Sequence, residues 1–140
     1  MPRPRTPVVP ARWEAHHRPV LETTWTATIT FTRANGAPVH DPATGSTSQP
    51  RITVYSGPVR LQNHERGNAP TAVAAAEQIT THRYQVSGPV EMDLAKYDVG
   101  TVNASSDPTL VGRELRVIDI QRGSLLFDRT AICTDNLEAT

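Results

Sequence analysis

Residues 107–136 read DPTLVGRELRVIDIQRGSLLFDRTAICTDN, and this pattern predicts two β-strands joined by a tight turn. Asp107-Pro108 favours a turn, because proline fixes its own φ and keeps the preceding residue out of the helical region. Arg113 to Gln121 supplies the bulky, β-branched residues typical of a strand. Arg122-Gly123 provides a position that tolerates positive φ, as a hairpin turn requires. Leu125 to Thr134 is predicted to return as the second strand.

The first of these strands has an irregular apolar pattern. Leu115 and Val117 share one face, whereas Ile118 and Ile120 share the other. Either the strand is buried on both faces, or a bulge near Val117 changes the side-chain parity. Both alternatives favour a small closed or strongly curved sheet.

The composition predicts one small, mainly β domain. The chain has 140 residues, of which 37% are hydrophobic, with twelve prolines and eight glycines. That length corresponds to a single domain, and the prolines and glycines favour many short elements joined by turns. We therefore expect a small β-barrel or sandwich of about six to seven antiparallel strands, with long projecting loops and an extended N-terminal arm.

Charge and cysteine content exclude several classes of partner. The formal net charge is zero, so no global field attracts nucleic acid or a membrane surface. Cys133 is the single cysteine, so no internal disulfide forms and a reducing compartment is expected. No apolar run approaches the ~20 residues that span a bilayer. We expect synthesis in the cytoplasm, no membrane partner and no secretory signal.

The chain divides into an arm, a domain and a tail. Residues 1–20 are predicted to form an extended arm, with a possible short helix from Ala11 to Arg18 that ends before Pro19. Residues 21–136 form the barrel-like domain and 137–140 the tail. The arm holds four arginines and one glutamate, a net +3 that suits a neighbouring subunit. Its candidate inter-subunit contacts are Arg3, Pro4, Arg5, Pro7, Val8 and Val9.

A long connection follows the most regular strand of the chain. Thr24 to Arg33 alternates threonine with apolar residues, which predicts a half-buried strand. Residues 34–50 then form either a small extended hairpin or a mobile loop that projects from the barrel. Its length exceeds what two antiparallel strands need, so we expect an assembly or gating role. The candidate residues are Asn35, Gly36, Val39, His40, Asp41, Thr44 and Gly45.

Two predicted strands in the middle of the chain contain the same short sequence, Ser-Gly-Pro. Arg51 to Gln62 is predicted as a strand interrupted at Ser56-Gly57-Pro58, and His82 to Met92 as a strand containing Ser87-Gly88-Pro89. Because proline has no N–H to donate to a neighbouring strand, both copies of this sequence indicate bends or edges at a barrel corner. Residues 72–76 are alanine-rich and predict at most a helical turn. A shorter strand is expected over residues 99–105.

No catalytic, metal or cofactor motif is present in the sequence. The P-loop, the dinucleotide fingerprint, the nucleophile elbow and zinc spacings are all missing. His16 and His17 have no ligand at a suitable spacing, so we interpret them as surface residues. Cys133 is interpreted as an inert buried thiol. An acidic run is interpreted as a solvated rim; it comprises Glu91, Asp93 and Asp98.

Aromatic and basic residues allow one alternative function. A nucleic-acid platform on a small barrel would use stacking rings beside cations. Its candidates would be Tyr55, Tyr84 and Phe127, with Arg51, Arg60 and Arg83. The neutral charge argues against this alternative.

In chain order, four segments resemble one family. They are VYSGPVRLQ (residues 54–62), Tyr84-Gln85-Val86, the run DVGTV (residues 98–102) and DPTLVGRELRVIDI (residues 107–120). Over roughly Ile52 to Asp135 the sequence resembles the head-to-tail connector proteins, of the stopper or head-closure type, of long-tailed phages that infect actinobacteria. Residues 87–89 depart from that pattern, where a bulkier residue before proline is expected. The N-terminal arm and residues 34–50 have no counterpart in it.

The resemblance implies a structural virion protein without enzymatic activity or cofactors. Such proteins are small β-barrels or sandwiches that form a ring, here expected to be a hexamer. The ring would lie between the portal and adaptor rings above and the tail terminator or tail tube below. It would hold packaged DNA and dock the tail, with DNA passing through the lumen without sequence readout. The alternatives are another neck or tail ring, such as a tail terminator or minor tail protein, or a small-barrel binding module.

Overall fold

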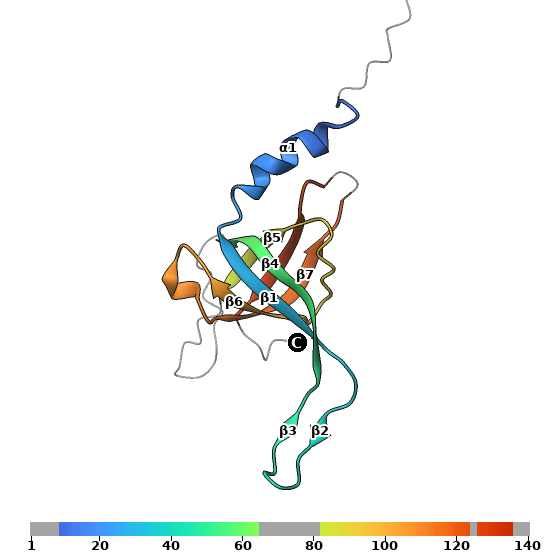
Figure 1. The fold of residues 1–140 in the computed structure, drawn as a ribbon, viewed down its shortest axis with the longest axis vertical. Coiled ribbons are helices and arrows are strands. Elements are labelled where there is room, and N and C mark those ends of the chain that lie inside the picture. The colour runs from blue at the N-terminus through green and yellow to red at the C-terminus, as the bar shows by residue number, and fades with distance from the viewer. Residues whose placement is uncertain (1–8, 65–81, 124–125, 136–140) are drawn as a thin grey trace, which may run out of the picture.

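A computed structural model of the chain describes residues 9–64, 82–123 and 126–135, and its centre is a closed antiparallel barrel of six strands (Figure 1). Each strand pairs with the next in the order β1-β4-β5-β8-β7-β6, and β6 pairs with β1 to close the ring. The prediction of a mainly β fold is confirmed, in its barrel form. The barrel strands are β1 (Ala27–Ala34), β4 (Arg51–Asn63), β5 (Arg83–Gly88), β6 (Val99–Ala104), β7 (Glu114–Gln121) and β8 (Arg129–Thr134).

The alternation predicted for the first strand is confirmed in β1. Ala27, Ile29 and Phe31 are buried in the core, and the threonines between them point outward. The strand begins at Ala27 and not at Thr24, because residues 23–26 form the turn that ends the preceding helix. Thus a period of two in the sequence places the inner wall of the barrel.

Helix α1 (Trp13–Glu22) corrects the prediction of a helix that stops before Pro19. A proline inside a helix removes one hydrogen bond to the carbonyl four residues earlier, here that of Ala15. Both Ala15 and Pro19 are exposed, so water can satisfy that carbonyl and the helix continues for three more residues. No residue of α1 is buried.

Strand β4 runs without a break through Ser56-Gly57-Pro58, which corrects the predicted interruption. The strand changes partner there instead: residues up to Val59 pair with β1, and residues from Arg60 onward pair with β5. Pro58 therefore pairs with β1 only and faces no strand on its other side. A strand tolerates proline at such a position, because the missing N–H leaves no hydrogen bond of the sheet unmade. The second copy of this sequence, at residues 87–89, ends β5 at Gly88, so that strand is shorter than predicted.

The bulge predicted near Val117 is present in β7. The register of β7 against β8 shifts between Val117 and Asp119. Leu115 and Val117 are buried before the shift, and Ile120 packs against the core after it. The alternative of burial on both faces is excluded, because the remaining residues of β7 are exposed or half-buried.

The segments around this hairpin differ from the prediction in their limits. Strand β8 begins at Arg129, four residues later than expected. Upstream, Pro108–Leu110 forms the 3-10 helix η1, which Asp107 caps by accepting a hydrogen bond from the Thr109 N–H at 3.0 Å. The alanine-rich residues 72–76 and the tail at 137–140 lie outside the described residues.

Gly100 is required by the packing of the core. It pairs with Phe31 across β1 and β6, and a Cβ placed on it would lie 2.6 Å from the Phe31 ring. We expect Gly100→Ala to lower the free energy of unfolding by about 1–3 kcal/mol, because the buried ring must shift. Denaturant unfolding measures this. Thr101→Ala, whose side chain faces outward, should change the same quantity by less than about 0.5 kcal/mol.

Candidate functional site

The connection between β1 and β4 is an extended hairpin that leaves one end of the barrel (Figure 1). Its strands, β2 (Val39–His40) and β3 (Thr47–Ser48), form a separate two-stranded sheet. Of the two forms predicted for residues 34–50, the structure has the hairpin. All seven candidate residues of this segment therefore lie in one projecting element.

Asp41 organises the tip of the hairpin. Its carboxylate accepts hydrogen bonds from the Ala43 N–H at 2.9 Å and the Thr44 hydroxyl at 3.0 Å. Its carbonyl accepts from the Gly45 N–H at 2.8 Å, and Gly45 has a φ of +69°, which glycine adopts without strain. The Ala43 N–H, followed by the Thr44 hydroxyl, holds the pKa of Asp41 below its ordinary value. The tip is thus an anionic turn that closes on itself.

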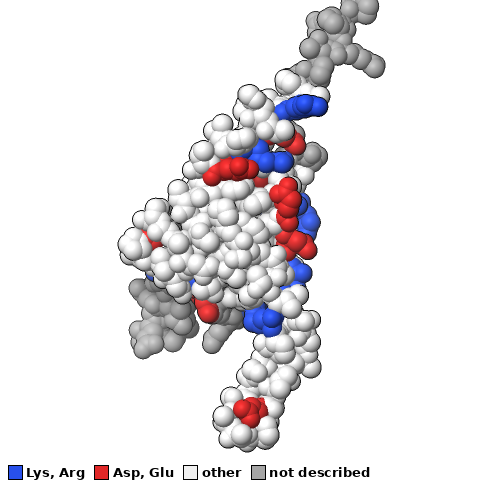
Figure 2. Space-filling model, in the orientation of Figure 1, with Lys and Arg blue, Asp and Glu red and all other residues white. Residues whose placement is uncertain are grey.

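The sides of the hairpin are held by bonds within the hairpin. His40 Nδ1 lies 3.2 Å from the Thr47 hydroxyl, and the Gln49 amide donates to the Gly36 carbonyl at 2.7 Å. Residues 34–48 are all exposed, and Val39 keeps 56% of its surface accessible. Asp41 is the only Lys, Arg, Asp or Glu in residues 34–50, and the acidic atoms of the hairpin lie at its tip (Figure 2). A hairpin that does not pack on its own barrel is available to other molecules.

An ion pair with a buried carboxylate fixes the root of the hairpin. Arg33, near the end of β1, donates from Nε and Nη2 to the two carboxylate oxygens of Asp98, both at 2.9 Å. The Ala95 N–H adds a third bond to Asp98 at 2.8 Å, and the Arg33 guanidinium also bonds the Asp93 carbonyl at 3.1 Å. Asp98 is 1% exposed, which corrects its assignment to a solvated acidic rim.

A second arginine secures the other strand of the root. Arg51, the first residue of β4, donates to the hydroxyl of Thr32 at 2.9 Å and to its carbonyl at 3.0 Å. The two arginines together tie the start and the end of the hairpin to the barrel, so the direction of projection is set by the body of the domain.

The opposite end of the barrel carries α1 (Figure 1). Trp13 of α1 packs edge-on against Phe127 at 4.7 Å and against the ring of His17 at 4.6 Å. Val20 of α1 is 67% exposed, and Val9 just before the helix is 42% exposed. The other predicted arm residues, Arg3, Pro4, Arg5, Pro7 and Val8, lie outside the described residues.

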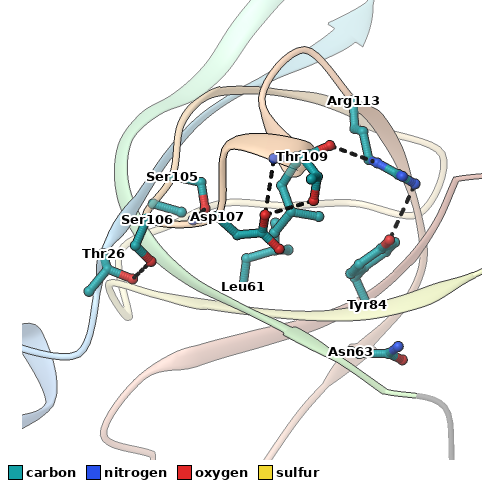
Figure 3. Close-up of a pocket in the computed structure, with 11 residues that line it drawn as sticks. Thr26, Leu61, Asn63, Tyr84, Ser105, Ser106, Asp107, Thr109 and Arg113 are labelled. Carbon is teal, nitrogen blue, oxygen red and sulfur yellow. Dashed lines mark hydrogen bonds between the residues drawn. The ribbon is translucent and has the colours of Figure 1, made fainter.

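A shallow pocket of about 320 Å³ lies beside η1 (Figure 3). The Thr26 and Ser106 hydroxyls meet at 3.4 Å on one side of it. Its ionisable groups are engaged within the chain: Asp107 accepts from the Thr109 hydroxyl at 2.7 Å, and Arg113 donates to the Tyr84 hydroxyl at 3.4 Å. These groups support the structure of the pocket, and their arrangement does not define a substrate.

The described residues contain no metal cluster and no membrane-spanning helix. No group of three His, Cys, Asp or Glu residues within the described ranges could hold a metal ion. Helices long and apolar enough to cross a bilayer are likewise missing from that part of the chain.

The aromatic residues considered for a nucleic-acid platform do not form one. Tyr84 is 8% exposed and belongs to the core, and Phe127 packs against Trp13 of α1. Tyr55 folds over Gly57 and donates to the Pro58 carbonyl at 2.8 Å, where burial raises the pKa of its phenol. The three rings therefore do not share an exposed face.

Cys133 is buried in β8, and burial raises the pKa of its thiol to about 12. An unfolded thiol ionises from about pH 8.5, so this group leaves stability unchanged below that pH. Above it, the free energy of unfolding falls as the pH rises toward about 12.

We expect iodoacetamide at pH 8 to label the native thiol about a thousandfold more slowly than the denatured one. Mass spectrometry with and without denaturant measures the ratio, and equal rates would show an accessible thiol.

The sequence reasoning missed one exposed cluster, at Tyr97. This residue has a φ of +77°, and it is the one described residue other than glycine in the left-handed region. Lys96 Nζ lies 5.2 Å and Arg116 Cζ 4.8 Å from the centre of its ring. The backbone strain has no signal in the sequence, because tyrosine is not a residue expected at such a position.

Comparison with known proteins places the chain in a family. No curated protein and no solved structure matches it. A family model does match, over residues 17–134, from within α1 to the last residue of β8. Because this match covers most of the chain, the protein belongs to DUF6093, a family of unknown function.

Proposed function

We propose that this protein is a structural virion protein that forms a ring in the neck of a long-tailed phage. The ring would close the portal channel after DNA packaging and give the tail its docking surface. The observation that carries the proposal is the pair of elements, α1 and the hairpin, that extend from opposite ends of one small barrel (Figure 1). The sequence resemblance to stopper proteins of actinobacterial phages supports the same role.

The exposure of these elements supports assembly with other subunits. No residue of α1 is buried, and Val20 and Val39 rank among the most exposed large apolar residues of the described chain. An isolated domain gains nothing from holding such groups in water, whereas a ring can bury them between subunits.

The surface between the two elements also suits contacts between proteins. Figure 2 shows a broad barrel face without Lys, Arg, Asp or Glu, while the charged side chains gather along one side. On the outer side of β1, β4 and β6, hydroxyl and amide groups bond each other: Thr30 lies 3.0 Å from Ser56 and accepts from Asn103 at 2.7 Å. Interface cores are depleted of charge in the same way.

The charge of the chain is compatible with a DNA channel. A strongly basic lining would hold DNA through its phosphates and slow its exit. The net charge here is zero, and the hairpin has no lysine or arginine between residues 35 and 50. DNA would then pass the ring without being retained.

The proposal is tested by locating the protein in particles and by removing it. Mass spectrometry and microscopy of purified particles should find several copies at the head–tail joint. A nonsense mutation in the gene should give heads that lose their DNA and separate, unjoined tails. A single copy at the joint, or none, would contradict the proposal.

The alternatives give different results in the same experiments. Full heads with unjoined tails after the nonsense mutation would indicate a tail terminator or another neck ring. Tight binding of DNA by the purified monomer would indicate a nucleic-acid-binding module, and such binding would weaken steeply with salt.

A further inference from the structure

The first part of β4 has an edge without a partner strand. Residues 51–59 pair with β1, whereas pairing with β5 begins only at Arg60. In the part of the chain that the structure describes, no backbone hydrogen bond reaches residues 51–56 from the side away from β1. Figure 1 shows this end of β4 leaving the barrel toward the hairpin. Such an edge is a template on which a further strand can pair.

The hydrogen-bond pattern shows which backbone groups point to the open side. The Asn35 N–H donates to the Pro50 carbonyl at 2.8 Å, in register with the pairing of β1 and β4. Because opposed residues in an antiparallel pair are alternately bonded and non-bonded, Ile52 bonds to β1. Arg51 and Thr53 therefore direct their N–H and C=O groups away from β1, and they offer two donors and two acceptors to a new strand.

Two other strand segments beside an open side are protected against such pairing. Pro58 has no N–H, and its carbonyl accepts a hydrogen bond from the Tyr55 hydroxyl at 2.8 Å. Near the end of β7, the Asp119 carboxylate occupies the Ile120 N–H at 2.9 Å. Prolines and charged side chains are common means of blocking an exposed edge.

The start of β4 lacks this protection. Arg51 is the only charged residue in residues 51–56, and its guanidinium bonds to Thr32 of β1, away from the open side. Ile52 follows it with 46% of its surface exposed, and Thr53 is exposed as well. Both are β-branched residues that favour strand pairing.

We propose that the free protein forms a two-fold dimer, in which this edge pairs antiparallel with the same edge of a second copy. With the axis at Ile52, Arg51 of each copy exchanges two backbone hydrogen bonds with the partner's Thr53. Ile52 then lies opposite the partner's Ile52 in a non-hydrogen-bonded pair, whose Cα atoms are about 4.5 Å apart and whose side chains touch. The exposed apolar residue is covered by its own counterpart.

A second copy suits this edge because the edge is complementary to itself. Its donors and acceptors are equal in number, and in this register no charged side chain lies directly opposite another. Antiparallel pairing also places the residues before Arg51 beside those after the partner's Thr53, so each hairpin runs along the other barrel. Residues 34–48 are all exposed, and they can add to the area of about 800 Å² per partner that stable interfaces bury.

This inference goes beyond the neck role and does not depend on it. A contact that uses the same surface on both subunits joins two copies and stops, whereas a ring requires head-to-tail contacts. The dimer is therefore a state of the free protein, and its subunits would separate when they join a particle.

Sedimentation equilibrium of the purified protein tests whether the dimer exists. It should show monomers and dimers and no larger species. At about 0.1 mM protein a contact with a micromolar Kd is almost fully formed. A protein that is still monomeric at that concentration would overturn the inference.

A single cysteine tests where the copies meet. Because Cys133 is buried, Ile52→Cys gives each chain one exposed thiol. Two such thiols across the axis fall within the Cα separation that a disulfide requires, so diamide should convert most of the protein to a linked dimer. The matched control is Val111→Cys, at a residue that is 47% exposed and lies outside β4, and it should form little dimer. Equal rates of dimer formation by the two variants would exclude the proposed axis.

Removal of one backbone N–H tests the pairing itself. Thr53→Pro deletes an N–H that points away from β1, a position at which an edge strand accepts proline. Dimerisation should weaken by about tenfold or more, because the two-fold axis doubles the loss of one hydrogen bond. Thr53→Val keeps the N–H and the β-branched shape, so its dimer should stay within about threefold of the original. Equal association of the proline and valine variants would contradict the strand pairing.

Discussion

Replacing Ala37 to Gln49 with a short Gly-Ser link is expected to leave the barrel folded and to abolish infectivity. The removed residues bond mainly to one another, so the free energy of unfolding should change by less than about 1 kcal/mol. Assembly should fail because each subunit loses one of the two exposed elements on which the proposed assembly of the ring depends. Thermal unfolding of the purified protein and plaque assays of the phage measure the two effects.

A matched control keeps the hairpin and changes only its composition. Ala43→Ser alters the exposed tip without removing the Ala43 N–H that bonds Asp41, so it should be neutral in both assays. Normal infection by particles with the short link would show that the hairpin has no role in assembly. A large loss of stability would instead show that the hairpin supports the barrel.

Arg33→Met is expected to lower the free energy of unfolding by about 3 kcal/mol, the range measured when one partner of a buried ion pair is removed. The Asp98 carboxylate, which is 1% exposed, would lose two of the three hydrogen bonds that it accepts from Arg33 and Ala95. The Arg33 side chain is 35% exposed, which places the effect toward the lower end of that range. Urea unfolding measures the change.

Arg51→Met is the matched control for this substitution. Arg51 is exposed and bonds the neutral hydroxyl and carbonyl of Thr32, so its loss should cost about 1 kcal/mol or less. If both substitutions had equally small effects, the Arg33–Asp98 pair would not be a structural anchor of the hairpin root.

Several features of this protein could be predicted because they depend on neighbouring residues. The threonine alternation in β1 predicts an inner and an outer face without reference to the rest of the chain. The turn residues around 34–50 allow a hairpin as one of two alternatives, the other being a mobile loop. The parity change at Val117 allows a bulge, since the two sets of apolar residues cannot otherwise both reach one core. Local periodicity was sufficient for each of these.

Features that depend on residues far apart in the chain could not be predicted from the sequence. Arg33 and Asp98 are 65 positions apart, and nothing in the acidic run distinguishes the one carboxylate that is buried. The change of partner at Pro58 depends on where β5 begins to pair, which only the closed barrel determines. Pro19 was expected to end α1, but its exposure on a helix without buried residues lets water satisfy the freed carbonyl.

By itself, the sequence determined a small, neutral, mainly β domain without a catalytic motif, with a long projecting segment at residues 34–50 whose only charged residue is Asp41. The tertiary structure alone decided that the sheet closes between β1 and β6, and that Asp98 anchors the hairpin root. It also decided that Tyr97 adopts a left-handed conformation between two cations. The physical reason is the range of the forces involved. Periodicity and turn chemistry act over a few residues, whereas barrel closure, buried charge pairing and strain are set by groups that meet only when the chain folds.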